Sequence, residues 1–200
     1  KITEKLKTLS DSGLYTDIID FHSANSKDLS AKSLFYIGRA YFMTEDDANS
    51  LKYLEQSIIK DAKDTEPLYL KGVTYRFMGK YEESVSCFKK AIDLNSEESK
   101  FHASLGDSYY DLKKYEEALA AYSMATSLED CPDRPYSMIA QVYSNLKEND
   151  KALAAYYNAK SNISKETNSY INALYNIGLF ESLKGNYDQA EQAFEELLKI

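Results

Sequence analysis

The chain has 200 residues, of which 44% are hydrophobic and 28% are charged, so it is long enough to bury a sizeable core. Its formal net charge of −8 at pH 7 argues against nucleic acids and anionic membranes as partners, because both would repel it. No apolar run approaches the roughly 20 residues that cross a bilayer, and no signal segment opens the chain.

Small residues recur along the chain at a fixed interval. Four of them follow one another at steps of 34 residues, and a fifth follows after 38, the same step with a four-residue insertion: Gly38, Gly72, Gly106, Ala140 and Gly178. A tyrosine keeps the step at Tyr41, Tyr75, Tyr109 and Tyr143. A constant period of this length predicts a repeat protein.

Each repeat carries the spacing of two helices, and the third repeat shows it best. Between Phe101 and Lys113, small or apolar residues fall at steps of one, three and four, which predicts one face of a helix. A second helix is predicted by Tyr115, Ala118, Tyr122 and Ala125. The connection between the two is too short for anything but an antiparallel hairpin. In two other repeats this turn holds Gly79 and Gly185, which suit a left-handed helix end.

The small residue in the middle of each first helix predicts a close approach of two helices. A glycine there costs about 1 kcal/mol of helix propensity, which close packing must offset. Large side chains are expected opposite these positions, at Leu54, Phe88, Tyr122, Tyr156 and Phe194. Because one hairpin cannot bury its apolar face alone, the hairpins are expected to stack on one another.

The order of small residue, tyrosine, turn, tyrosine, alanine, aromatic residue and alanine resembles the tetratricopeptide repeat. Residues 100–130 match nearly every position of that signature. The resemblance implies an all-α fold, a right-handed solenoid of stacked antiparallel helical hairpins with a concave groove.

The resemblance divides the chain into five units that form a single domain: 31–64, 65–98, 99–132, 133–166 and 171–200. Residues 1–30 resemble a degenerate preceding unit, with Gly13 and Tyr15 at its turn. The pattern departs from the family at Asn149, which replaces a turn tyrosine, and at Glu181, which replaces a first-helix tyrosine.

No motif of catalysis, metal binding or cofactor binding occurs, so we expect no enzyme activity, no metal and no cofactor. His102 is expected in the core, and His22 in a partly exposed packing or surface position. Cys87 falls on an outer helix and Cys131 in a loop, and two cysteines cannot form a disulfide framework.

The concave face of the first helices is the expected binding site for a partner. Projecting that face selects Phe35, Arg39, Phe42, Tyr69, Arg76, Phe77, Asp107, Tyr110, Gln141, Asn145 and Tyr175. Exposed aromatic side chains on a soluble protein usually mark an interaction site. In the alternative interpretation, Phe35 and Phe77 pack between adjacent first helices. Arg39 and Arg76 would hold acidic groups, so we expect a partner with acidic and aromatic or aliphatic residues.

The sequence therefore predicts a non-catalytic scaffold that binds a peptide or helical segment of another protein. A self-assembling scaffold and a substrate-presenting arm of a larger enzyme are the alternatives. The chain starts at Lys1 and stops at Ile200, inside a predicted second helix. We therefore expect a fragment of a longer repeat protein, or a homo-oligomer that covers the repeat ends. A cytoplasmic location is favoured, with a processed exported protein as the alternative.

Overall fold

The computed structural model describes residues 1–24 and 29–200, and every regular element in that part of the chain is an α-helix. The all-α prediction is confirmed. The helices form two compact units, Lys1–Ser96 and Glu97–Ile200. The assignment of all repeats to a single domain stays a prediction, and each unit is described by itself below.

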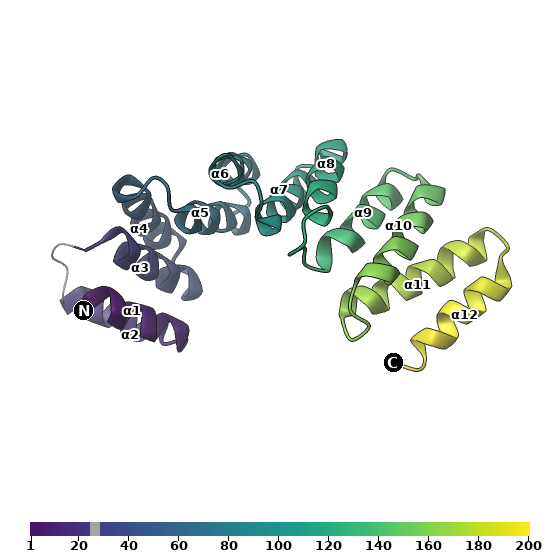
Figure 1. Cartoon of the computed structure of the whole chain (residues 1–200), viewed down its shortest axis with the longest axis horizontal. Coiled ribbons are helices and arrows are strands. Elements are labelled where there is room, and N and C mark those ends of the chain that lie inside the picture. Colours follow the sequence, from purple (N-terminus) through teal and green to yellow (C-terminus); the bar gives the residue numbers. More distant parts are fainter. Residues whose placement is uncertain (25–28) are drawn as a thin grey trace. The chain divides into compact units, whose positions relative to one another are not determined.

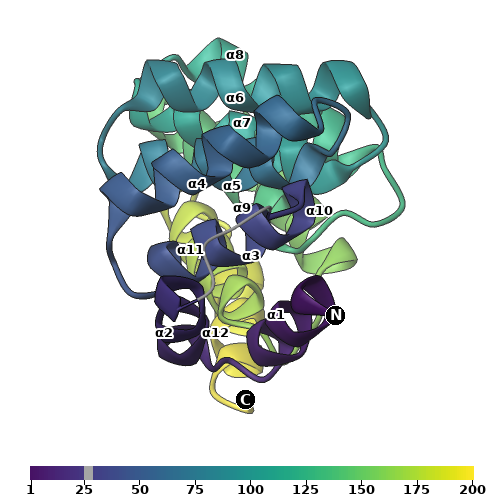
Figure 2. The ribbon, with the colours of Figure 1, turned by 90° about the vertical axis from the view of Figure 1, so that its left-hand side faces the viewer.

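The first unit consists of three helical hairpins (Figure 1). Its helices are α1 (Ile2–Asp11), α2 (Tyr15–Ala24), α3 (Ala31–Met43), α4 (Asp47–Lys60), α5 (Thr65–Phe77) and α6 (Tyr81–Leu94). Both α1 and α2 contact α3, and Figure 2 shows these three helices from the side. Their shared core contains Leu6, Ile18 and Ile37.

The second unit consists of three further hairpins. Its helices are α7 (Ser99–Asp111), α8 (Tyr115–Thr126), α9 (Arg134–Asn145), α10 (Asn149–Asn162), α11 (Asn168–Leu183) and α12 (Tyr187–Leu197). In both units, the helix pairs in contact are at most two helices apart in the chain, as far as the described residues show. The core of each unit is therefore built from neighbouring hairpins, as expected for a stacked repeat.

The glycine in the middle of a first helix allows close packing, as the sequence predicts. A Cβ atom on Gly106 would lie 2.6 Å from ring atoms of Tyr122, which is fully buried on the second helix of the same hairpin. The same clash would occur between Gly72 and Phe88, at 2.8 Å. Any side chain at these positions would force the opposing ring to shift.

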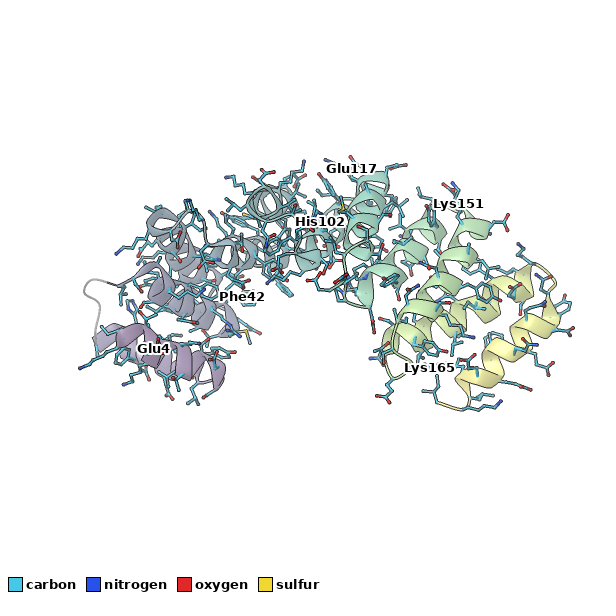
Figure 3. The ribbon with its side chains drawn as sticks, viewed as in Figure 1. Glu4, Phe42, His102, Glu117, Lys151 and Lys165 are labelled. Carbon is cyan, nitrogen blue, oxygen red and sulfur yellow. The ribbon has the colours of Figure 1, made fainter. Side chains whose placement is uncertain are left out.

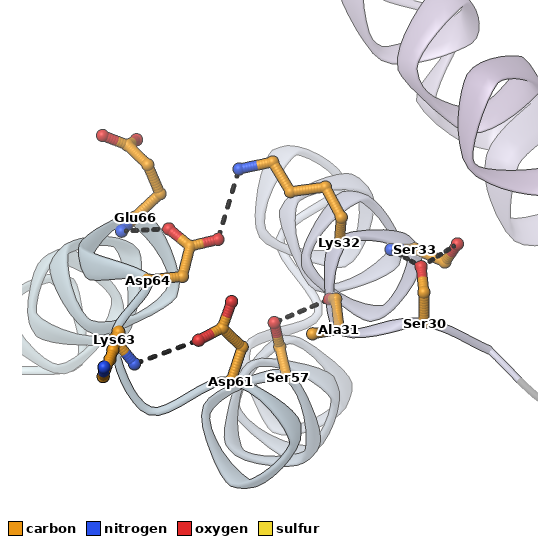
Figure 4. Close-up of polar contacts among 9 residues, drawn as sticks. All are labelled: Ser30, Ala31, Lys32, Ser33, Ser57, Asp61, Lys63, Asp64 and Glu66. Atoms are coloured by element: carbon orange, nitrogen blue, oxygen red, sulfur yellow. Dashed lines mark hydrogen bonds and ion pairs between the residues drawn. The ribbon is translucent and has the colours of Figure 1, made fainter.

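Polar side chains fix the ends of the helices in the first unit (Figure 4). Ser30 caps α3, because its Oγ accepts a hydrogen bond from the backbone N–H of Ser33 at 3.1 Å. The Ser57 hydroxyl donates to the carbonyl oxygen of Ala31 at 2.7 Å and so ties α4 to the start of α3. Asp64 caps α5 and also pairs with Lys32 at 3.3 Å. Polar contacts thus hold α3 to α4 within one hairpin and join that hairpin to the start of α5.

A polar cluster ties the last helix of the second unit to the preceding ones. The Glu196 carboxylate on α12 accepts hydrogen bonds from Lys160 Nζ on α10 at 2.6 Å and from the Tyr170 hydroxyl on α11. These two hydrogen bonds hold the pKa of Glu196 below its ordinary value. Burial, together with the hydrogen bond to Glu196, raises the pKa of Tyr170 to about 12.

Glu196→Gln is expected to destabilise the second unit at neutral pH. Because the folded-state pKa of Glu196 is lowered, its stabilising effect is present above the unfolded value of 4.5 and is lost as the pH falls through the folded value. The variant and the unchanged chain should therefore differ in unfolding free energy at pH 7, and the difference should shrink as the pH falls below 4.5 and through the folded value, as followed by urea denaturation. Glu195→Gln is the matched control, since the ion pair of Glu195 is with Lys199, two residues beyond the end of α12, at 3.9 Å. A difference between variant and unchanged chain that persists at low pH contradicts the role of the ionised carboxylate.

Candidate interaction surfaces

The side chains that the sequence proposes for partner binding all lie on α3, α5, α7, α9 and α11. We call these the first helices, because each opens a hairpin of the repeat. Two of them belong to the first unit and three to the second. The surfaces of the two units are considered in turn.

In the first unit, the C-terminal ends of α3 and α5 form an apolar pocket. It has a volume of about 520 Å³ and is lined by Phe42, Met43, Glu45, Asp47 and Phe77. The ring centroids of Phe42 and Phe77 lie 5.8 Å apart at an interplanar angle of 54°. Phe42 is labelled on α3 in Figure 3. Phe77 is nevertheless 75% exposed and Met43 is 48% exposed. Exposed apolar groups gathered in this way are typical of an interaction surface.

Phe35 does not belong to that surface. It is only 7% exposed and lies in one core cluster with Leu6 and Ile18. Both α1 and α2 pack against α3 and contribute to that cluster. Phe35 therefore stabilises the N-terminal core and is not accessible to a partner.

The remaining proposed residues of the first unit are half-buried. The ring of Tyr69 lies 5.7 Å from that of Phe88, so much of it packs within its own hairpin. Arg76 already interacts with other groups of the chain. Arg39 forms no ion pair with any residue that the structure describes. Arg39 is thus the cation that this surface offers to a partner.

In the second unit, Asp107 makes contacts within the protein. Its Oδ1 accepts a hydrogen bond of 2.6 Å from the Tyr122 hydroxyl and one of 3.1 Å from Arg134 Nη2. These contacts join α7 to α8 and α9. Asp107 is therefore tied to the packing of the second unit before any partner binds.

Tyr110, Gln141 and Asn145 form a connected polar row across α7 and α9. Asn145 Nδ2 donates to the Tyr110 hydroxyl oxygen at 2.9 Å, and Gln141 Nε2 donates to Asn145 Oδ1 at 3.3 Å. Side-chain amides can both donate to and accept from a peptide backbone. The row therefore has the chemistry to bind a polypeptide without selecting its charge.

α11 exposes a row of apolar side chains in addition to the exposed amides of Asn168 and Asn172. Ile171, Tyr175, Leu179 and Leu183 follow one another at four-residue steps and are 36%, 49%, 39% and 77% exposed. Side chains at this spacing form a single ridge on a helix. The sole charged residue in the sequence of α11 is Glu181, and it is buried. We call these four residues the α11 ridge.

The sequence interpretation missed Glu45 and Asp47, which line the pocket of the first unit. The available signal was the acidic run Glu45–Asp47, which follows Met43 after the single residue Thr44. Its place beside the pocket depends on the turn between α3 and α4, where Glu45 has a positive φ of 61°. Only the tertiary structure brings these carboxylates next to Phe77.

The histidines and cysteines show no arrangement for chemistry. His22 and His102 are both buried, and His22 Nε2 lies 2.7 Å from the Tyr53 hydroxyl. Burial raises the pKa of the Cys87 thiol, and burial with nearby Asp130 and Asp133 raises that of Cys131 to about 11. High thiol pKa values disfavour the reactive thiolate.

The described residues contain neither a cluster suited to a metal ion nor a helix suited to crossing a membrane. No group of three or more histidine, cysteine, aspartate or glutamate side chains is arranged to hold a metal ion in that part of the chain. Nor does any helix there have the length and apolar character needed to cross a membrane.

Comparison with known families decides the nature of the repeats. Models of the tetratricopeptide repeat match residues 69–135 and residues 134–200. The chain belongs to the tetratricopeptide repeat family. The resemblance seen in the sequence is thereby confirmed over the last four hairpins. Tetratricopeptide repeat proteins generally serve as non-catalytic scaffolds for protein interaction.

Solved structures of other tetratricopeptide repeat proteins share the fold. MamA from Desulfovibrio magneticus RS-1 is 21% identical, with 84% of this chain and 93% of that chain covered and a TM-score of 0.70. The C-terminal part of a repeat protein from Cytophaga hutchinsonii is 16% identical over 99% of this chain and 81% of that one, with a TM-score of 0.81.

YrrB, described as a tetratricopeptide repeat protein with an unusual peptide-binding site, is 18% identical over 91% of each chain, with a TM-score of 0.66. No curated protein matches the sequence. At these identities, the likenesses to solved structures show the fold alone.

Proposed function

We propose that the chain is a non-catalytic interaction module that binds a segment of a partner protein on the exposed faces of its first helices. The observation that carries this proposal is the α11 ridge. Its four apolar side chains are contiguous, more than a third exposed and free of charged neighbours on their own helix. The cores of protein interfaces are depleted of charge in the same way, so the ridge has the composition of a contact surface.

Polar groups beside the ridge supply the hydrogen bonds that an apolar ridge lacks. A pocket of about 250 Å³ between α9 and α11 is lined by Gln141, Asn168, Asn172 and other mostly polar side chains. The amide side chains that line this pocket, together with Asn145 of the polar row, would form hydrogen bonds with the backbone of a bound segment. That a protein of the same fold, YrrB, has a peptide-binding site supports this reading of the surface.

In the first unit, the proposed contacts are Phe42, Tyr69 and Phe77 for apolar groups and Arg39 for an acidic group. Arg76 is a weaker candidate for this role, because it already interacts within the chain. A flexible segment loses conformational freedom when it binds, so we expect dissociation constants of about 1 μM rather than in the nanomolar range.

Replacing Tyr175 by serine is expected to weaken partner binding. A desolvated aromatic anchor contributes on the order of 2 kcal/mol, so the dissociation constant should rise about thirtyfold. Peptides selected on the folded chain from a random display library are the probes, and fluorescence anisotropy measures their affinity. Tyr187→Ser is the matched control, because Tyr187 is 71% exposed on α12, outside the ridge.

Peptides that bind Tyr175→Ser and a Leu179→Ser/Leu183→Ser variant as tightly as the unchanged chain would contradict the ridge as the site, provided that circular dichroism shows all variants folded. Light scattering on the same samples separates self-assembly from peptide binding. A molecular mass that rises with concentration in the unchanged chain, and not in the ridge variants, would show that the ridge binds a second copy.

A further inference from the structure

The pocket of the first unit differs from the α11 ridge in its charge. Phe42, Met43 and Phe77 form an apolar floor, while Glu45 and Asp47 complete the lining with carboxylates. Neither carboxylate forms an ion pair with a residue in the described part of the chain. The apolar site therefore has an acidic edge whose charge is not neutralised by the chain itself.

A third acidic group strengthens this edge. Asp46 lies between the two lining carboxylates and caps α4, accepting hydrogen bonds from the backbone and side-chain nitrogens of Asn49 at 3.0 and 2.7 Å. These hydrogen bonds hold the pKa of Asp46 below its ordinary value, so it remains negatively charged at neutral pH. Residues 45–47 thus place three acidic residues in succession, of which Glu45 and Asp47 line the pocket with Phe77.

A basic residue lies on the same face of α3, one turn before the apolar floor, although it does not line the pocket itself. Arg39 precedes Phe42 and Met43 by three and four residues on α3, so the three side chains share one face of that helix. From Arg39, the chain runs to the apolar residues Phe42 and Met43 and then to the acidic turn Glu45–Asp47. The surface is consequently polarised, and a ligand that matches it must be polarised in the opposite sense.

We propose that this pocket binds one apolar side chain of a partner protein segment that has a basic residue on the Glu45 side and an acidic residue on the Arg39 side. The inference rests on the proposed function and specifies the partner for the first unit. Arg39 lies about 6 Å before Met43, the last residue of α3, at 1.5 Å per residue, and Glu45 follows in the turn after the helix. An extended segment rises about 3.3 Å per residue, so a few of its residues span this stretch and its acidic and basic residues closely flank the apolar one.

The selected peptides themselves give the first test. Panning a random dodecapeptide library on the intact chain is expected to enrich sequences in which a basic and an acidic residue flank an apolar one, within about four positions. Their affinity should fall about tenfold or more in Phe77→Ser, and it should weaken as salt is added because the charges are screened. A library that yields no binder dependent on Phe77 overturns the proposal.

A charge exchange gives the second test. The double variant Glu45→Lys/Asp47→Lys should lose at least about tenfold in affinity for such a peptide, and a peptide whose basic residue is replaced by glutamate should regain it on that variant alone. Lys52→Glu/Lys63→Glu is the matched control, with two charge changes at exposed positions of the same unit outside the pocket lining. Binding that is indifferent to the charge exchange overturns the inference.

The outcome also separates this inference from the proposed function. If peptide binding depends on Tyr175 and not on Phe77, the proposed interaction module stands, and the partner proposed for the first unit is ruled out. A second copy of the chain as occupant would appear as a concentration-dependent mass in light scattering that Phe77→Ser abolishes, and this result too would overturn the inference.

Discussion

Replacing Ala118 by glutamate is expected to destabilise the second unit more than any other single change considered for this chain. Ala118 is fully buried on α8, in one cluster with Tyr122 and Val142. Glutamate there would carry an uncompensated charge into the junction between α8 and α9. The cost of such a charge is on the order of 3–5 kcal/mol, enough to unfold many domains.

Thermal and urea denaturation followed by circular dichroism measure this effect. Ala120→Glu is the control, because it makes the same change at an exposed position of the same helix. It should alter the unfolding free energy by less than about 0.5 kcal/mol. Equal unfolding free energies for Ala118→Glu and Ala120→Glu would show that the buried face of α8 has been assigned to the wrong residues.

Tyr122→Ala is expected to have the second largest effect. The ring of Tyr122 is fully buried against Gly106, and its hydroxyl donates to Asp107 at 2.6 Å. Removing a buried aromatic ring costs about 3–5 kcal/mol, because the helices cannot close the cavity completely. The loss should appear in urea denaturation as a lower midpoint.

Two further variants divide that loss into its parts. Tyr122→Phe keeps the ring and removes the hydrogen bond, so it should cost about 1 kcal/mol. Tyr187→Ala deletes the same atoms from a side chain that is 71% exposed on α12, and it should be nearly neutral. If Tyr122→Phe lowered the unfolding free energy as much as Tyr122→Ala, the stabilisation by Tyr122 would come from its hydrogen bond to Asp107 and not from the packing of its ring.

The repeat pattern was sufficient to predict the hairpins, because their packing depends on pairs at fixed spacing. Gly72 and Phe88, like Gly106 and Tyr122, are 16 residues apart, and in each pair the ring fills the space that the glycine leaves. The left-handed turns at Gly79 and Gly185 were predictable for the same local reason.

The sequence could not show where non-glycine residues take the same turn. Glu45, Lys113 and Lys147 have φ values of 61°, 59° and 60°. An L-residue in this region is strained, and only the rest of the hairpin forces it there. The helix pattern that extends to Lys113 in the sequence consequently ends at Asp111 in the structure.

Glu181 illustrates a departure from the family pattern that the structure accommodates. Its carboxylate is buried, yet it accepts hydrogen bonds from the Tyr157 hydroxyl and from Asn186 Nδ2, both at 2.7 Å. These partners come from α10 and from the turn before α12, so no local pattern reveals them. A buried carboxylate is tolerated when its oxygens are satisfied in this way.

The candidate site was predictable only in part. Helical projection placed the proposed side chains on the first helices, but it could not foresee that Phe35 is buried in the N-terminal core or that Asp107 is engaged by Tyr122 and Arg134. Nor could it find Glu45 and Asp47, which follow the helix instead of lying on it. Contacts between hairpins, and not the periodicity within one, determine which side chains remain accessible.

The restriction of helix contacts to close neighbours in the chain has a consequence for synthesis in the cell. Folds with such local contacts form in microseconds to milliseconds, because little loop entropy is lost before the contacts are made. A ribosome takes roughly 2–7 s to add the 34 residues of one repeat at 5–20 residues per second. Within each unit, a hairpin therefore has time to dock on its predecessor before the next one emerges, which limits the exposure of unpaired apolar faces during translation.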